Sequence, residues 1–192
     1  MPEPATPSDT AYVIFTAQVG QKSTDAFILL CTELMSKGTG HVYLLLSSPG
    51  GNVMLGITLY NLMRSFPLKF TAHNIGNVDS IALLLYLAAD TRYSARSSTF
   101  MFHGVGIDTK APLRLEERLL AEKLEAFRAD HKRLAGIVID RAKFKDQSEV
   151  TALYAQEATK DVEWAKAVGI VHEIRDPQIP KGSVIHRIAS TD

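Results

Sequence analysis

The chain has 192 residues and a formal net charge of zero, because 21 Lys and Arg residues balance 21 Asp and Glu residues. This length fits one domain with a hydrophobic core. A neutral chain lacks the electrostatic attraction that polyanions need, so the composition argues against nucleic acid or an anionic membrane as a partner. The hydrophobic fraction of 46% and the charged fraction of 22% exclude disorder of the whole chain.

The number of cysteines and the length of the apolar runs indicate the cellular compartment of the protein. Cys31 is the only cysteine, so the chain can form neither an internal disulfide nor a cysteine-based metal cluster. The longest apolar run, residues 81–89, is far shorter than the roughly 20 residues of a membrane-spanning helix. The first ten residues lack the basic and apolar regions of a signal peptide. We therefore expect a cytoplasmic protein with no membrane span and no metal site.

Strand and helix patterns alternate through the first half of the chain. We expect strands over residues 12–19, 41–47, 68–75, 91–95 and 99–102, and helices over residues 23–38, 54–66 and 80–89, with a turn over residues 76–79. The uninterrupted apolar run at residues 41–47 is typical of a strand covered on both faces. This order predicts an α/β fold with β-α-β crossovers and a largely parallel sheet.

A long, charged helix is predicted from about residue 112 to residue 141. Its apolar positions form one narrow stripe, made of Leu120, Leu124, Phe127, His131, Leu134 and Val138. Such a stripe packs either on its own domain or on another subunit, and the sequence leaves both open. Further helices are expected over residues 149–158 and 162–168. We therefore divide the chain into a flexible start (1–11), a head with the long helix (12–176) and an extended tail (177–192).

Three stretches fall at the carboxyl ends of predicted strands, where a parallel α/β sheet places its active site. The first is Ser48-Pro49-Gly50-Gly51, whose glycines leave amide N–H groups uncrowded, as an oxyanion hole requires. The second carries Ser80 at the start of an apolar helix. The third is His103, whose imidazole could act as a general base. Taken singly, each also fits an ordinary turn, a helix cap or a surface histidine.

Together and in this order, the stretches resemble the ClpP family of serine peptidases. The resemblance rests on VYLLLSSPGGNV, NIGNVDSIALLLYLAA, SSTFMFHGV and KDVEWAKAVGIVHEI, and it covers residues 12–174. It implies an α/β, ClpP/crotonase-like fold, in which a parallel-sheet β-α-β superhelical head carries a protruding long-helix handle. It also implies a reaction that needs no cofactor.

The family's site residues carry over by position. The resemblance implies Ser80 as the nucleophile, His103 as the general base, and the backbone amides of Gly51 and Ile81 as the oxyanion hole. The orienting acid falls on Glu157, with Asp161 as the alternative acid. Substrate-binding positions fall on Gly50, Asn52, Val53 and Gly104.

One neighbour of the nucleophile departs from the family pattern. Asp79 precedes Ser80 where the family has a small residue. A carboxylate here would oppose a developing oxyanion unless its side chain points away or is paired. The remaining histidines show no metal-ligand spacing, and no function is assigned to His41, His73, His131, His172 or His186.

The resemblance predicts a serine endopeptidase that cleaves peptides or unfolded proteins inside a homo-oligomeric ring, of which a double heptamer is one form. Docking of an ATPase unfoldase is left open, because only about eleven residues precede the first predicted strand. Two alternatives are a catalytically weak or inactive ClpP-like structural subunit and a crotonase-type acyl-CoA enzyme.

Overall fold

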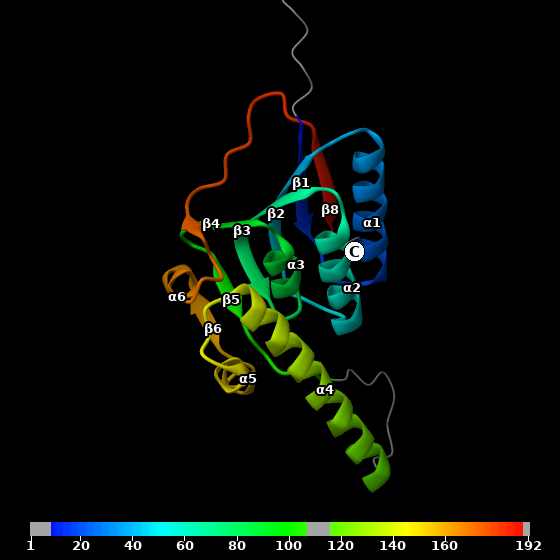
Figure 1. Ribbon diagram of the computed structural model, residues 1–192, viewed down its shortest axis with the longest axis vertical. Helices are drawn as coiled ribbons and strands as arrows, with labels where there is room; N and C mark the ends of the chain where they lie inside the picture. The colour runs from blue at the N-terminus through cyan, green and yellow to red at the C-terminus, as the bar shows by residue number, and fades with distance from the viewer. Residues whose placement is uncertain (1–8, 107–115, 190–192) are drawn as a thin grey trace, which may run out of the picture.

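The computed structural model describes residues 9–106 and 116–189, which form one α/β unit (Figure 1). In chain order the elements are β1 (Thr10–Thr16), α1 (Gln21–Ser36), β2 (His41–Ser48), α2 (Val53–Ser65), β3 (Lys69–Asp79), α3 (Ala82–Ala88), β4 (Thr91–Ser94), β5 (Thr99–Met101), α4 (Glu117–Arg141), α5 (Gln147–Ala155), β6 (Thr159–Asp161), α6 (Val162–Ala167), β7 (Glu173–Ile174) and β8 (Ile185–Ala189).

The strands form one sheet in the order β6-β5-β3-β2-β1-β8, with β4 paired to both β3 and β7. All pairings are parallel except that of β5 with β6, which is antiparallel. The carboxyl ends of β1, β2, β3 and β5 therefore point the same way. This confirms the α/β fold with a largely parallel sheet.

The hydrophobic core lies between the sheet and helices α1, α2 and α3. Phe27 of α1 packs edge-on against Phe15 of β1 and also contacts Phe70 of β3. All seven residues of α3 are buried. A helix that is apolar all round has to be covered on every side, which explains why α3 lies in the centre of the molecule in Figure 1.

Two local expectations differ from the structure. Residues 76–79, expected as a turn, are the last part of β3, which continues to Asp79 beyond a register shift against β2. The following helix begins at Ala82 rather than at residue 80, because the backbone at Ser80 has a left-handed φ of 54°. The strand pairing of residues 77–79 with β5 is long-range, and a local pattern does not encode it.

The long helix α4 extends away from the rest of the molecule in Figure 1. Its C-terminal half packs on the core through Leu134 and Val138, which are buried. Its N-terminal half is different, since Leu120 and Leu124 are 51% and 48% exposed. The apolar stripe is thus covered at one end and open at the other. Residues 112–115 of the predicted helix lie outside the described part of the chain.

Beyond residue 176, the chain adds the strand β8, which pairs in parallel with β1. No strand was predicted there. Its sequence, IHRIA, is too short and too mixed to show periodicity, so the pairing with β1 defines it.

Candidate active site

The Ser48-Pro49-Gly50-Gly51 loop is fixed to the end of β1. The buried Ser48 hydroxyl donates to the Ala17 carbonyl at 2.7 Å and accepts from the Gly50 amide at 3.2 Å. Val19 donates its amide to the Gly50 carbonyl at 2.7 Å. Gly50 and Gly51 both have positive φ, 88° and 146°, which side chains other than hydrogen disfavour. The glycine pair therefore gives the loop a shape that two L-residues would not readily adopt.

Ser80 occupies a strained turn between β3 and α3. Its φ of 54° is left-handed, and a serine in that region is held there only by its surroundings. The holding contact is the Ser80 amide, which donates to the Met101 carbonyl of β5 at 2.8 Å. A sharp, strained strand-to-helix turn is one way in which enzymes expose a nucleophilic serine.

The glycine loop and the serine turn touch each other. A Cβ atom added to Gly50 would lie 2.7 Å from Ser80 Cβ, 2.7 Å from the Asp79 carbonyl oxygen and 3.2 Å from the Ile81 amide nitrogen. In the described part of the chain, neither the Gly51 nor the Ile81 amide donates a hydrogen bond. Two uncommitted N–H groups thus lie on the two segments that meet at Ser80, as an oxyanion hole requires.

Asp79, the residue before the serine, is paired. Its Oδ2 accepts a 2.5 Å hydrogen bond from the side-chain Nδ2 of Asn77, and the side-chain Oδ1 of Asn77 accepts from the Ser47 hydroxyl at 2.8 Å. These three side chains lie on one face of neighbouring strands. The pairing meets the condition under which a carboxylate can stand beside a nucleophile. The sequence pattern did not reveal the roles of Ser47 and Asn77, although the spacing of two residues between Asn77 and Asp79 hints at a shared strand face.

His103 lies two residues after the end of β5 and is half-buried. Its Nδ1 atom lies 2.8 Å from the carbonyl oxygen of Gly104. Because a carbonyl oxygen can only accept, Nδ1 carries the proton in this contact, which leaves Nε2 of a neutral ring with its lone pair. Within the described residues the ring makes no hydrogen bond to Ser80 or Glu157. The geometry therefore gives the tautomer of a general base without closing a full Ser-His-acid chain.

The two candidate acids occupy different places beside β5. In the antiparallel register Thr99 faces Asp161 and Met101 faces Thr159. The pairing continues, since the Phe102 amide donates to the Ala158 carbonyl at 2.9 Å. The next pair in this register is His103 with Glu157.

Asp161, by contrast, lies four residues further along, which is about 13 Å in a strand. Its carboxylate caps α6 by accepting from the Trp164 amide at 2.8 Å. Glu157 has a left-handed φ of 50°, and within residues 9–106 and 116–189 it shares positive φ with only one other non-glycine residue, Ser80. Strained backbone of this kind gathers at functional sites.

The substrate-binding positions expected near the loop are partly used by the fold. The Asn52 amide donates to the Val19 carbonyl at 2.8 Å, and its side chain caps α2 by accepting from Leu55 at 3.0 Å. Val53 begins α2 and is half-buried. Gly50 and Gly104 lie in the segments that flank Ser80 and His103. The sequence pattern alone could not distinguish a residue that caps α2, such as Asn52, from a residue that contacts substrate.

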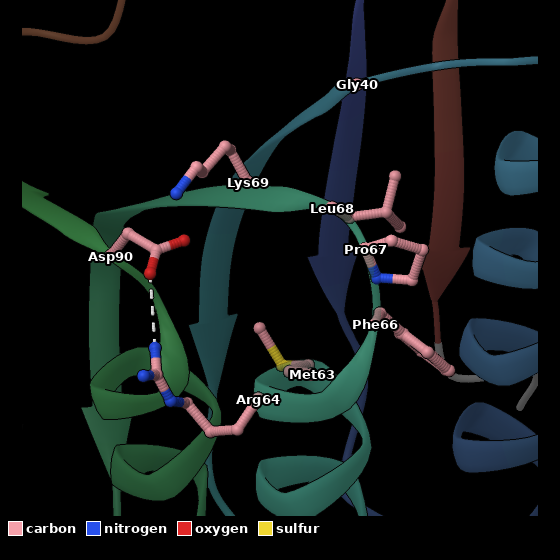
Figure 2. Close-up of a pocket in the computed structure, with 8 residues that line it drawn as sticks. All are labelled: Gly40, Met63, Arg64, Phe66, Pro67, Leu68, Lys69 and Asp90. Atoms are coloured by element: carbon pink, nitrogen blue, oxygen red, sulfur yellow. Dashed lines mark hydrogen bonds and ion pairs between the residues drawn. The ribbon is translucent and has the colours of Figure 1, made fainter.

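One cavity in the described part of the chain is remote from these residues. It has a volume of about 430 Å³ and lies between the end of α2 and the start of β3 (Figure 2). Arg64 and Asp90, 3.1 Å apart, form an ion pair at this cavity. Lys69 begins β3 and Asp79 ends it, so the cavity is about 30 Å from Ser80 at roughly 3.3 Å per residue. It takes no part in the candidate site.

Among residues 9–106 and 116–189, no cluster of three or more His, Cys, Asp or Glu side chains is placed to hold a metal ion. In the same part of the chain, no helix has the length and apolarity to cross a membrane. Cys31 is buried, and burial raises the pKa of its thiol to about 12. The cysteine is therefore a core residue and no second nucleophile.

Comparison with known proteins places this fold. Two solved structures share it, those of ClpP1 from Listeria monocytogenes and of an asparagine-to-aspartate point mutant of that protein. Their TM-scores are 0.69 and 0.74, and each is 18% identical over 87% of this chain and 92% of the other. The model of the Clp protease family matches residues 8–178. The chain belongs to the Clp protease family.

A curated relative is more similar over a shorter stretch. ATP-dependent Clp protease proteolytic subunit 2 of Pseudomonas aeruginosa is 30% identical over 93 residues, which are 47% of this chain and 46% of the relative. In this match, the chain spans about half the length of the relative.

Proposed function

We propose that this protein is a serine endopeptidase that cleaves peptides or unfolded proteins, with Ser80 as the nucleophile and His103 as the general base. The observation that carries the proposal is the meeting of three segments at Ser80. The left-handed serine contacts the glycine loop, its amide donates to Met101 of β5 two residues before His103, and uncommitted amides lie on both sides. Membership of the Clp protease family supports the same reaction.

The proposed reaction follows from these positions. Ser80 Oγ attacks the scissile carbonyl carbon while His103 Nε2 takes the hydroxyl proton, and the tetrahedral oxyanion accepts hydrogen bonds from the Gly51 and Ile81 amides. His103 then gives the proton to the leaving amine, and water repeats the sequence to release the acyl group. The chemistry requires no metal or organic cofactor.

Glu157 is the acid that we propose orients His103. The antiparallel register favours it over Asp161, whose carboxylate already caps α6. Triads with either Asp or Glu occur, and the side chain of Glu is longer by one methylene. Hydrogen bonds between catalytic groups are often long in the free enzyme and tighten when substrate binds.

The experiment is covalent labelling of the purified protein with a fluorophosphonate, followed by mass spectrometry of the adduct. We expect a single adduct on Ser80 that is absent from Ser80→Ala and at least 100-fold slower to form in His103→Ala. A matched control is His186→Ala, which changes a histidine of β8 and should react at the rate of the unmodified protein. No labelling at any pH between 6 and 9 would overturn the proposal and favour an inactive structural subunit of the same fold.

We further propose that a second copy of the chain covers the open half of the α4 stripe. Leu120 and Leu124 expose apolar surface on one side of a helix whose later stripe residues Leu134 and Val138 are buried in the same chain. A protruding helix whose apolar stripe is exposed to solvent is suited to pairing with another helix. This assembly would form or join the homo-oligomeric ring that the family resemblance implies.

Native mass spectrometry tests the assembly. The double variant Leu120→Glu, Leu124→Glu should shift the particle to smaller species while leaving the circular dichroism spectrum unchanged. The control is Leu29→Glu, which changes a leucine of α1 that is 70% exposed. If the double variant keeps the mass of the unmodified protein, α4 does not hold the copies together.

A further inference from the structure

A second histidine, His131 of α4, contacts the segment that follows His103. Its Nε2 atom lies 3.0 Å from the amide nitrogen of Val105. An amide N–H can only donate, so His131 Nε2 must be unprotonated and a neutral ring must carry its proton on Nδ1. No function was assigned to His131 from the sequence, in which it is one residue of the apolar stripe on α4.

The two histidines are joined by one peptide group. The carbonyl oxygen of Gly104 accepts from His103 Nδ1 at 2.8 Å, and the amide of Val105, on the other side of the same peptide bond, donates to His131 Nε2 at 3.0 Å. A peptide group that accepts at one end and donates at the other is polarised by both contacts, so each hydrogen bond strengthens the other. The chain of contacts runs from α4 through this peptide to the proposed general base.

The position of His131 is itself fixed by packing. Its ring lies 5.8 Å from the ring of Tyr154 on α5, and Tyr154 in turn packs edge-on against Phe102 at 5.7 Å. Tyr154 is buried, and burial raises its pKa far above the ordinary range, so its hydroxyl remains neutral. Phe102 is the residue directly before His103. His131 and His103 are therefore anchored to the same aromatic cluster from two sides.

We propose that His131 is a positioning residue that sets the orientation and tautomer of His103 through the Gly104–Val105 peptide. The proposal rests on the proposed function, because it assigns a role relative to the general base. Loss of the Val105 acceptor would free the peptide plane to rotate, and the Gly104 carbonyl would then no longer hold the Nδ1 proton of His103. Misplacing a catalytic group in this way lowers the reaction rate about 10-fold to 100-fold.

Two substitutions separate positioning from packing. His131→Phe keeps an aromatic ring against Tyr154 but removes the acceptor, whereas His131→Gln supplies a side-chain carbonyl oxygen that can accept from Val105. We expect His131→Phe to slow fluorophosphonate labelling and to lower kcat about 10-fold to 100-fold with little change in KM, and His131→Gln to stay within about threefold of the unmodified protein. Lys132→Ala, on the exposed side of the same helix, is the control and should leave both values unchanged.

A spectroscopic measurement is independent of activity. In long-range ¹H–¹⁵N spectra of histidine-labelled protein, His131 and His103 should both show the Nδ1–H tautomer, and His103 should become a mixture of tautomers in His131→Phe. An Nε2–H tautomer at His131, an unchanged His103 in His131→Phe, or equal labelling of His131→Phe and the unmodified protein would overturn the inference. If the unmodified protein itself is not labelled, the proposed function fails, and the tautomer of His103 in His131→Phe alone decides the positioning role.

Discussion

Replacing Gly50 with alanine probes the contact on which the candidate site depends. The new Cβ would lie 2.7 Å from Ser80 Cβ and from the Asp79 carbonyl, whereas ordinary contacts begin at 3.4 Å. The Ser80 turn or the loop must therefore move by about 0.7 Å. The φ of 88° adds a left-handed penalty of about 1–2 kcal/mol, and overpacking adds about 1–3 kcal/mol.

The expected loss in the free energy of unfolding is thus about 2–5 kcal/mol, measured by urea denaturation. Because the displaced atoms belong to the turn of the proposed nucleophile, fluorophosphonate labelling of Ser80 should slow by up to about 100-fold. Gly38→Ala is the matched control, since Gly38 has a similar φ of 76° but open space around it. It should lose only about 1–2 kcal/mol and react at the normal rate.

The contact between the loop and the serine would be refuted by one pair of results. If Gly50→Ala loses no more stability than Gly38→Ala and labels at the rate of the unmodified protein, the loop does not press on Ser80. The comparison is sharp because both variants carry the same backbone penalty and differ in what the added methyl group meets.

Three further predictions concern single side chains. Glu157→Gln should slow peptide hydrolysis at least 100-fold, whereas Asp161→Ala should mainly destabilise α6 by about 1 kcal/mol through loss of its N-cap, and the reverse order in a rate assay would make Asp161 the orienting acid. Arg92→Met should lower the free energy of unfolding by about 3 kcal/mol in thermal denaturation, because Arg92, 3% exposed, donates to the carbonyls of three residues that its loss would leave unpaired; a loss under 1 kcal/mol would contradict this role. Burial raises the pKa of the Cys31 thiol to about 12, so Cys31 should resist iodoacetamide at pH 8 until the protein unfolds. If mass spectrometry detects rapid alkylation of the native protein, the Cys31 thiol is accessible and this expectation is wrong.

The role of Arg92 also explains a sequence motif. Its guanidinium binds the carbonyl oxygens of Gly169 and Ile170, within the stretch VGIV, and that of Arg141 at the end of α4. Arg141 donates in turn to the carbonyls of Leu87 and Ala89 at the end of α3. Cations at the C-terminal end of a helix satisfy its last carbonyls. The VGIV stretch therefore has a structural role, as an acceptor for the Arg92 guanidinium, rather than a role in the candidate active site.

Much of the fold was determined by the sequence itself. Uninterrupted apolar runs such as residues 41–47 require strands covered on both faces, and their alternation with helical patterns leaves a parallel sheet as the economical arrangement. The order of the glycine loop, Ser80 and His103 at strand ends likewise limited the place of the site, because carboxyl ends of parallel strands meet at one edge. These features depend on periods of two to four residues, which the chain displays locally.

The tertiary structure alone decided what depends on partners far along the chain. The left-handed backbone at Ser80 is held by Met101, the register of β5 against β6 places Glu157 rather than Asp161 opposite His103, and His131 contacts Val105, which is 26 residues away along the chain. Hydrogen bonds of this kind leave no periodic trace, because any donor and acceptor of the right geometry can form them. The sequence therefore predicted which residues to examine, and the long-range hydrogen bonds decided how each of them is held.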